Sequence, residues 1–346
     1  MTLLSDTVGR VFGALATKEL IESAEQGVWP EKLWGALEEG GLTLPLVSEA
    51  AGGAGGTWLD AHVVVRASGR HTAPVPLAET IIAGWLLSRA GLEVPFGPLT
   101  IAPVHAGEAL TLARRGGALA VTGTATRVPW GRHAGHVVTV ADVDGRPSIA
   151  LIATSGARIS EGANLAREPR DTLTFDDATV LAAAASDVTA DTIRLYGAMA
   201  RAAQMAGALD ACLEQAVRYA TERKQFGRPI GSFQVIQQNL AVLAGHVAAS
   251  GIAAESAFRA ADRGDARFEI AVAKIRVGEA AGVGAGIAHQ THGAIGFTYE
   301  HSLHFATRRL WSWRAEFGSE SAWARELGAS VAARGADALW RDLTAR

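Results

Sequence analysis

The stretch that decides the fold is Arg218-Tyr-Ala-Thr-Glu-Arg-Lys-Gln-Phe-Gly-Arg-Pro-Ile-Gly-Ser-Phe-Gln234. Apolar residues at helical spacing lead into it, namely Met205, Leu209, Cys212, Ala216 and Tyr219. A second apolar helical face follows it, formed by Phe233, Ile236, Leu240, Leu243 and Val247. Between the two faces stand Gly227, Pro229 and Gly231, which interrupt helices. The segment therefore predicts two long helices joined by a turn that presents Arg223 and Phe226.

Outward from this turn, the rest of the chain divides into three parts. Helical patterns fill residues 1–94, and residues 95–189 contain short β-branched runs at 118–122, 136–141, 148–153 and 171–175. The turn Val143-Asp-Gly-Arg146 predicts a hairpin between two of these runs. Residues 190–346 are helical again, with further helices expected at about 268–288, 303–314 and 322–344, the last capped by Ser319. The predicted fold class is α+β and mainly α, with an N-terminal helical domain, a small central β domain and a C-terminal four-helix bundle.

Composition narrows the class of protein further. The 346 residues are 49% hydrophobic and 19% charged, which is enough apolar sequence for sizeable cores. The formal net charge of -3 gives no sign of nucleic-acid or anionic-membrane binding, and polar residues interrupt the longest uncharged stretches. The lone Cys212 excludes an intrachain disulfide framework and a cysteine-based metal cluster. We expect a soluble cytoplasmic protein.

The segment around Arg223 resembles the signature of the acyl-CoA dehydrogenases, in which Arg-x-Gln-Phe-Gly follows a helix and Phe-Gln opens the next one. Weaker likenesses lie at Leu44 to Gly56, at Ala118 to Asp144 and at Gly293 to Glu300, so that the resemblance spans nearly the whole chain. It implies the acyl-CoA dehydrogenase fold, FAD as the cofactor, an acyl-CoA substrate, electron-transferring flavoprotein as the electron acceptor, and a tetramer of paired dimers.

The resemblance also assigns residues to the adenylate half of FAD bound by a neighbouring subunit: Arg223, Gln225, Phe226, Gln234, Gln290, His292 and Gly293. A guanidinium group is a rigid two-pronged donor that suits a pyrophosphate, and Phe226 offers an apolar face beside it. The competing interpretation is a tight connection between helices, with Arg223 on a solvated surface.

Two positions at which family members carry the catalytic glutamate hold other residues in this chain. They are Phe317, before Gly318, and Gly197, on an earlier helix, and neither side chain accepts a proton. The segments that face the flavin ring in the family are also altered, at Ile101 to Glu108 and at Arg127-Val-Pro-Trp130. Proline at position 129 has no N–H and no hydroxyl, so that two possible hydrogen-bond donors to a flavin ring are absent there. Trp130 stacks on the ring only if the segment is shifted by one residue.

The base and flavin-ring positions are thus altered, whereas the residues assigned to the adenylate half of FAD are kept. This pattern resembles the smaller, base-lacking chain of the α2β2 acyl-CoA dehydrogenases of actinobacterial steroid side-chain breakdown. The hypothesis is that the chain contributes the adenylate side of an FAD site, while a larger partner subunit supplies the base and the flavin-ring pocket. A first alternative is a self-sufficient homomer with an unconventional base, and a second is a non-catalytic structural or acyl-CoA-binding homologue.

The candidate unconventional bases are Glu316 and Glu300. We expect Glu316 to be a solvated surface residue and Glu300 to serve as a helix cap or in an ion pair. Four histidines crowd one span, at positions 289, 292, 301 and 304, but their spacing does not match a common zinc pattern, and no metal site is predicted.

Overall fold

Helices form both ends of the chain and strands form its middle in the computed structural model, which describes residues 3–105 and 107–344. The first part is helical and comprises α1 (Leu3–Leu15), α2 (Lys18–Glu25), α3 (Glu31–Glu39), α4 (Trp58–Arg70) and α5 (Leu77–Arg89). Helix α3 ends at Glu39, and Gly40 is its C-cap.

The middle part is a seven-stranded sheet in the order β1-β4-β5-β7-β3-β2, with β6 paired to β7. Its strands are β1 (Leu99–Ile101), β2 (Thr111–Arg115), β3 (Ala118–Pro129), β4 (His136–Val143), β5 (Arg146–Ala153), β6 (Ala157–Ser160) and β7 (Arg170–Ala185). The β4–β5 hairpin is confirmed, because Val143 pairs with Arg146. Asp144 and Gly145 both have positive φ, as a two-residue hairpin turn of this type requires.

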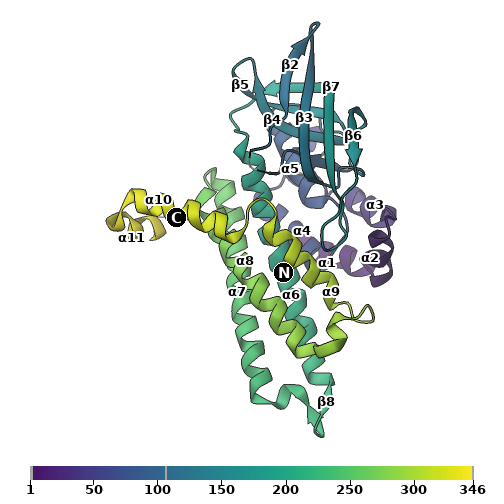
Figure 1. Ribbon diagram of the computed structural model, residues 1–346, viewed down its shortest axis with the longest axis vertical. Coiled ribbons are helices and arrows are strands. Elements are labelled where there is room, and N and C mark those ends of the chain that lie inside the picture. The colour runs from purple at the N-terminus through teal and green to yellow at the C-terminus, as the bar shows by residue number, and fades with distance from the viewer. Residues whose placement is uncertain (1–2, 106, 345–346) are drawn as a thin grey trace.

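The last part is a bundle of long helices, α6 (Asp191–Glu222), α7 (Gln234–Arg263), α8 (Arg267–His292) and α9 (Leu303–Ala315). The α6–α7 connection carries a two-residue strand pair, β8 (Lys224–Gln225) and β9 (Arg228–Pro229), and lies at the opposite end of the molecule from the sheet (Figure 1). The short helix η4 (Gly293–Phe297) separates α8 from α9. The predicted fold class is confirmed.

One detail of the helical prediction needs correction. The expected single helix over 322–344 is two helices, α10 (Glu320–Arg334) and α11 (Ala336–Thr344), because Gly335 between them has φ 82°. The predicted cap at Ser319 is confirmed, since its hydroxyl accepts a hydrogen bond from the Ala322 amide at 3.3 Å. Figure 1 shows α10 and α11 leading away from the side of the bundle.

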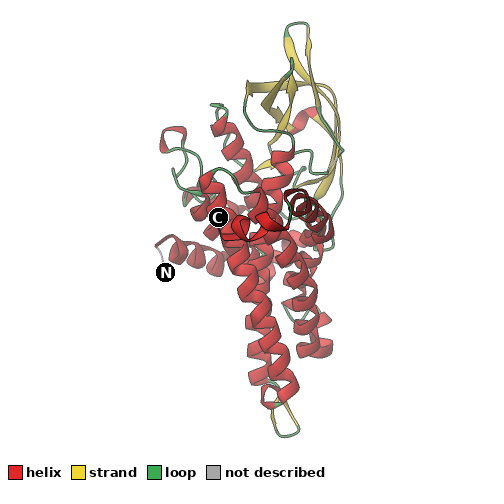
Figure 2. Ribbon diagram, turned by 90° about the vertical axis from the view of Figure 1, so that its left-hand side faces the viewer, coloured by secondary structure: helices red, strands yellow, loops and turns green. Residues whose placement is uncertain are grey.

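The N-terminal helices pack directly on the bundle, as the two views show (Figures 1 and 2). Helices α4 and α6 approach so closely that a Cβ atom on Gly69 would stand 2.0 Å from the Gln204 carbonyl oxygen. A Cβ atom on Gly207 would stand equally close to the Arg66 carbonyl oxygen. One buried core therefore runs from the first helices into the bundle.

Helix α7 is also long and apolar enough to cross a membrane by length and composition alone. Core helices of soluble proteins meet the same test, so that the finding is weak evidence. About a third of its most apolar window is buried in the chain.

Candidate functional site

The two positions at which the family resemblance places a base lie against each other. Gly197 is on α6, and Phe317 follows the end of α9. A Cβ atom on Gly197 would stand 2.4 Å from two ring carbons of Phe317, so that the phenyl ring fills the space in front of the glycine. Phe317 is buried and has φ 54°, a conformation that bulky residues rarely adopt. Two segments that are far apart in sequence thus form one apolar contact.

Glu316 is buried and ion-paired, so the expectation of a solvated surface residue is wrong. One carboxylate oxygen accepts a hydrogen bond from Arg170 Nε at 2.7 Å, and the other accepts one from Arg201 Nε at 2.7 Å. Burial alone would raise the pKa of Glu316, but the charges of Arg170 and Arg201 and their hydrogen bonds hold this pKa down to about 2. A carboxylate held in this way is a poor proton acceptor for the carbon acid of a thioester.

Glu316 belongs to a buried network that also joins α5, β7, α6 and α9. Arg201 pairs with Glu79 as well, and Glu168 lies within 3.0 Å of both Arg170 and Arg309. The Trp313 indole N–H donates to Glu168 at 2.9 Å. The network contains three acids and three arginines, so that its formal charges balance: Glu79, Glu168, Glu316, Arg170, Arg201 and Arg309.

Two further side chains hold the loop that contains Glu316 and Phe317. The buried Lys274 ammonium of α8 donates to the carbonyl oxygens of Arg314 and Gly318, each at 2.7 Å. The Trp323 indole N–H donates to the Phe317 carbonyl oxygen at 3.0 Å. The loop is therefore fixed by groups on α8 and α10, as well as by the ionic network.

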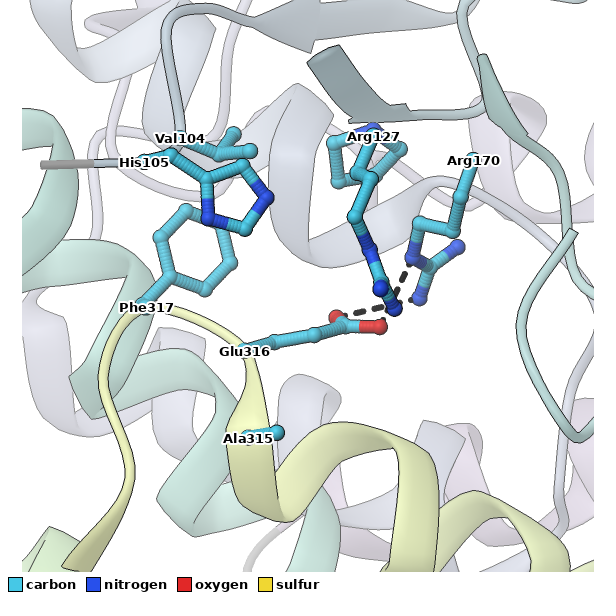
Figure 3. A pocket seen from close by; sticks show the side chains of 8 residues that line it. Val104, His105, Arg127, Arg170, Ala315, Glu316 and Phe317 are labelled. Atoms are coloured by element: carbon cyan, nitrogen blue, oxygen red, sulfur yellow. Dashed lines mark hydrogen bonds and ion pairs between the residues drawn. The ribbon is translucent and has the colours of Figure 1, made fainter. Parts of the chain in front are cut away.

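The space left beside this loop is small. Figure 3 shows the hollow, with Glu316 directed toward Arg170 and the Phe317 ring beneath His105. Its volume is about 90 Å³, whereas pockets for drug-sized ligands are roughly 300–1,000 Å³. Arg127 and Pro129, from the segment expected to face a flavin ring, line the hollow.

Trp130, from the same segment, does not line this hollow. It is 5% exposed, and its ring packs edge-on against Trp29 of the N-terminal part, with His133 nearby. The interpretation in which a shifted segment stacks Trp130 on a flavin ring is therefore wrong. The residues on this side do not fit an isoalloxazine ring.

The other end of the molecule is open. Arg223, Gln225, Phe226 and Gln234 lie at the α6–α7 turn, and all four are exposed. Phe226 is 91% exposed with φ 50°, and its ring meets Phe233 edge-on with centroids 6.1 Å apart. Within residues 3–105 and 107–344, the Arg223 side chain has no hydrogen-bond or ion-pair partner. This turn leaves a guanidinium and an aromatic face available to a ligand.

The remaining predicted residues lie where α8 ends. Gln290 and Gly293 line a surface groove of about 640 Å³ between α8 and α9. His292 points inward instead: it is 3% exposed, and its ring stacks on Tyr219 of α6 with centroids 4.6 Å apart. The structure thus brings the ends of α6 and α8 together, with Arg223 one helical turn beyond Tyr219 and Gly293 directly after His292.

Glu300 and the histidines take no part in the loop around Phe317. The expectation of a cap or an ion pair for Glu300 is wrong, because its side chain has neither among the described residues, whereas its carbonyl oxygen accepts from Lys18 at 3.1 Å. No set of three or more histidine, cysteine, aspartate or glutamate side chains in the described part of the chain is arranged to hold a metal ion.

Sequence reasoning missed the buried arginines at 170 and 201 and the buried acids that they bind. These residues are scattered between positions 79 and 316, and no spacing connects them. One signal was available: Arg201 stands in an alanine-rich segment of α6 with no acidic residue nearby in sequence. A charge in such a segment needs a partner from another part of the chain.

Comparison with known proteins agrees with this architecture. Residues 2–94 match the model of the acyl-CoA dehydrogenase N-terminal domain, and residues 191–330 match that of the C-terminal domain. The chain is 30% identical to the acyl-CoA dehydrogenase IpdE2 of Mycobacterium tuberculosis, over 89% of each chain. The chain belongs to the acyl-CoA dehydrogenase family.

Solved members of this family are similar over nearly their whole length. A variant of the Tcur3481-Tcur3483 steroid acyl-CoA dehydrogenase is 26% identical with a TM-score of 0.85, over 94% of this chain and 95% of that one. A chain of the ChsE4-ChsE5 complex from Mycobacterium tuberculosis is 25% identical with a TM-score of 0.87, over 96% and 98%. More distant fold neighbours have been solved with FAD bound, PigA among them.

Proposed function

We propose that this chain is a subunit of an FAD-dependent acyl-CoA dehydrogenase and completes the adenylate side of an FAD site on a larger partner chain. The partner supplies the catalytic base and the pocket for the flavin ring. The reaction is the α,β-desaturation of an acyl-CoA thioester, and electron-transferring flavoprotein takes up the electrons.

The observation that carries the proposal is the occupied base position. The Phe317 ring lies on Gly197, and Glu316 is held by two arginines. No carboxylate on this loop is free to remove an α proton, and the 90 Å³ hollow is too small for a thioester and a flavin ring. The buried network has balanced formal charges, and each of its three carboxylates is paired with at least one arginine, so that this region is an ordered part of the core.

The α6–α7 turn supports the other half of the proposal. Arg223 is exposed and unpaired among the described residues, so that binding of a pyrophosphate displaces no ion pair. Phe226 presents its ring to solvent at the same turn, which is costly for an isolated chain but suits a face for a cofactor or a partner. Bound FAD would supply the hydride acceptor of the reaction, and the role of these residues is to bind and orient its adenylate half.

The relatives support the substrate class and the assembly. The structures named above include a steroid acyl-CoA dehydrogenase and a complex of two named chains. We therefore propose a bulky acyl group, such as a steroid side chain, and a heterotetramer built from two copies of each subunit. With a single, buried cysteine, the chain suits a reducing cytoplasm.

Co-expression with candidate partners tests the proposal. The chain purified alone is expected to show no flavin absorbance near 450 nm and no acyl-CoA dehydrogenase activity, whereas the complex shows both. Full flavin content and normal turnover in the pure homomer would overturn the proposal and favour a self-sufficient enzyme. Absence of flavin from every complex would favour a non-catalytic homologue.

A further inference from the structure

A set of stacked rings joins the two parts of the proposed adenylate site. Tyr219, His292 and His301 form this ring cluster: Tyr219 and His292 stack at 4.6 Å, and His301 meets His292 at 4.6 Å, tilted by 64°. Tyr219 stands one turn before Arg223 on α6, and His292 stands directly before Gly293 at the end of α8. Any shift of this stack changes the spacing between Arg223 and Gly293.

The hydrogen bonds of His292 fix the tautomer of its neutral ring and favour this neutral form. Its Nδ1 donates to the Ala288 carbonyl oxygen at 2.7 Å, so the proton of the neutral ring is on Nδ1. Its Nε2 is buried and has no partner among the described residues. His304 repeats the pattern, with Nδ1 donating to the His301 carbonyl oxygen at 2.7 Å and a buried Nε2 without a partner. A second proton on either ring would create a buried N–H with no acceptor.

The surroundings of the ring cluster also disfavour added positive charge. The charged and titratable groups that face it from the neighbouring elements are Lys18 and Glu25 of α2, Arg218 of α6, His289 of α8, Tyr299 of the connecting loop, and His304 and Arg308 of α9. The one carboxylate among them, Glu25, is already paired with Arg308. Burial, followed for His301 by the neighbouring histidines and Lys18, lowers the pKa of both His292 and His301.

We propose that His292 is a positioning residue, whose neutral ring holds the Arg223 and Gly293 sides of the adenylate site in register through Tyr219 and releases them when it is protonated. The inference rests on the proposed function only in taking the adenylate half of FAD as the ligand of the Arg223 and Gly293 sides. It assigns no direct ligand contact to His292, which is buried.

The direction of the pH effect follows from the lowered pKa of His292. The pKa of such a histidine is lower in the folded chain than in the unfolded chain, where it is about 6.5. Its contribution to stability is therefore complete when the pH is above about 6.5, and it is lost as the pH falls below that value. At pH 5.5, the equilibrium constant for local opening rises by up to about tenfold for each such histidine.

Hydrogen exchange of the isolated chain at pH 7.5 and 5.5 tests the inference. Protection factors over residues 216–226 and 286–296, corrected for intrinsic exchange, are expected to fall several-fold at pH 5.5. The variant His292→Phe keeps a stacking ring that cannot be protonated, so its loss at pH 5.5 is expected to be smaller than that of the wild type. His292→Ala is expected to lose protection already at pH 7.5, because the stack itself is gone.

A matched control is His133→Phe, since burial lowers the pKa of His133 as well and its ring also stacks on an aromatic neighbour, Trp29. Its exchange over the two segments is expected to follow the wild type at both pH values. Equal protection of the wild type at pH 7.5 and 5.5, or an undiminished loss in His292→Phe, would overturn the inference.

Retention of FAD by the complex separates this inference from the proposed function. Flavin fluorescence released on dilution is expected to rise faster at pH 5.5 than at pH 7.5, and less so in His292→Phe. A complex without FAD at pH 7.5 would contradict the proposed function and leave the exchange result intact. A complex that holds FAD while exchange shows no pH dependence would contradict only the role of His292.

Discussion

A carboxylate taken out of water needs charged partners, and Glu316 has two of them in Arg170 and Arg201. Replacing Glu316 by glutamine leaves both buried guanidinium groups without a counter-charge at this position. We expect Glu316→Gln to lower the free energy of unfolding by about 3–5 kcal/mol, measured by urea denaturation. The matched control is Glu214→Gln, which breaks the exposed pair with Arg70 and is expected to cost about 0–1 kcal/mol.

Comparison of the wild type with Glu316→Gln at different pH values gives a further prediction. Because the pKa of Glu316 is about 2 in the folded chain, below its ordinary value, its contribution is complete above about pH 4.5 and is lost as the pH falls toward 2. The difference in unfolding free energy between wild type and Glu316→Gln is therefore expected to narrow from pH 7 to pH 3. A difference that stays constant over this range would show that the ion pairs do not stabilise the fold.

Gly197 is predicted to tolerate no side chain while Phe317 is present. A methyl group there overlaps the phenyl ring, with a Cβ-to-carbon distance of 2.4 Å. Gly197→Ala is expected to cost about 1–3 kcal/mol in thermal unfolding, and Phe317→Leu in the same chain is expected to recover part of this loss. As a control, Gly245→Ala in α7 meets no atom within 4 Å and is expected to leave stability unchanged or slightly raised. Equal costs for the two glycines would refute the contact.

At the scale of elements, substitutions in the α6–α7 turn are expected to change the binding of FAD without changing the stability of the fold. Its side chains are exposed, so that truncating Arg223 removes little from the fold. Hydrogen bonds to charged groups contribute about 1.5–3 kcal/mol, and Arg223→Ala is therefore expected to weaken FAD retention by the complex about 10–100-fold. Fluorescence of released flavin measures the effect. The neighbouring Lys224→Ala serves as control. An equal loss of FAD retention in both variants would show that only the net positive charge of the turn matters and would contradict a specific contact of Arg223.

Periodicity located most helices because their buried faces recur along the sequence. Met205, Leu209 and Cys212 of the first predicted face are indeed fully buried in α6. The second face is only partly so: Leu243 and Val247 are buried, but Phe233, Ile236 and Leu240 near the turn are half-exposed. The first turns of α7 extend beyond the packed part of the bundle, and periodicity carries no information about where a neighbouring helix ends.

At the scale of the whole molecule, the outer face of α7 is unusually apolar. Val235, Val242 and Ile252 are each at least 50% exposed. Ile252 and Val272 of α8 line a surface groove of about 570 Å³ together with Phe268. Exposed apolar surface of this kind is typical of subunit contacts, which agrees with the predicted tetramer of paired dimers.

Ile252→Lys is therefore expected to impair assembly without unfolding the chain. A lysine at this position places a charge in an apolar contact, which reduces the particle mass measured by light scattering, whereas the circular dichroism spectrum stays unchanged. The control is Leu181→Lys on β7, where a similarly exposed leucine lies in the sheet. Assembly of Ile252→Lys at the wild-type mass would exclude this face as an interface.

The sequence by itself determined the three-part order, most element positions and the Arg223 motif, because these depend on residues that are close together along the chain. Together with the family resemblance, it also predicted that the usual base positions are occupied by Gly197 and Phe317. Only the tertiary structure decided that these positions touch, that Glu316 is buried between two arginines, and that His292 faces inward onto Tyr219. Ion pairs and ring contacts between residues more than 70 positions apart depend on how helices and sheet pack, and that packing is absent from local spacing.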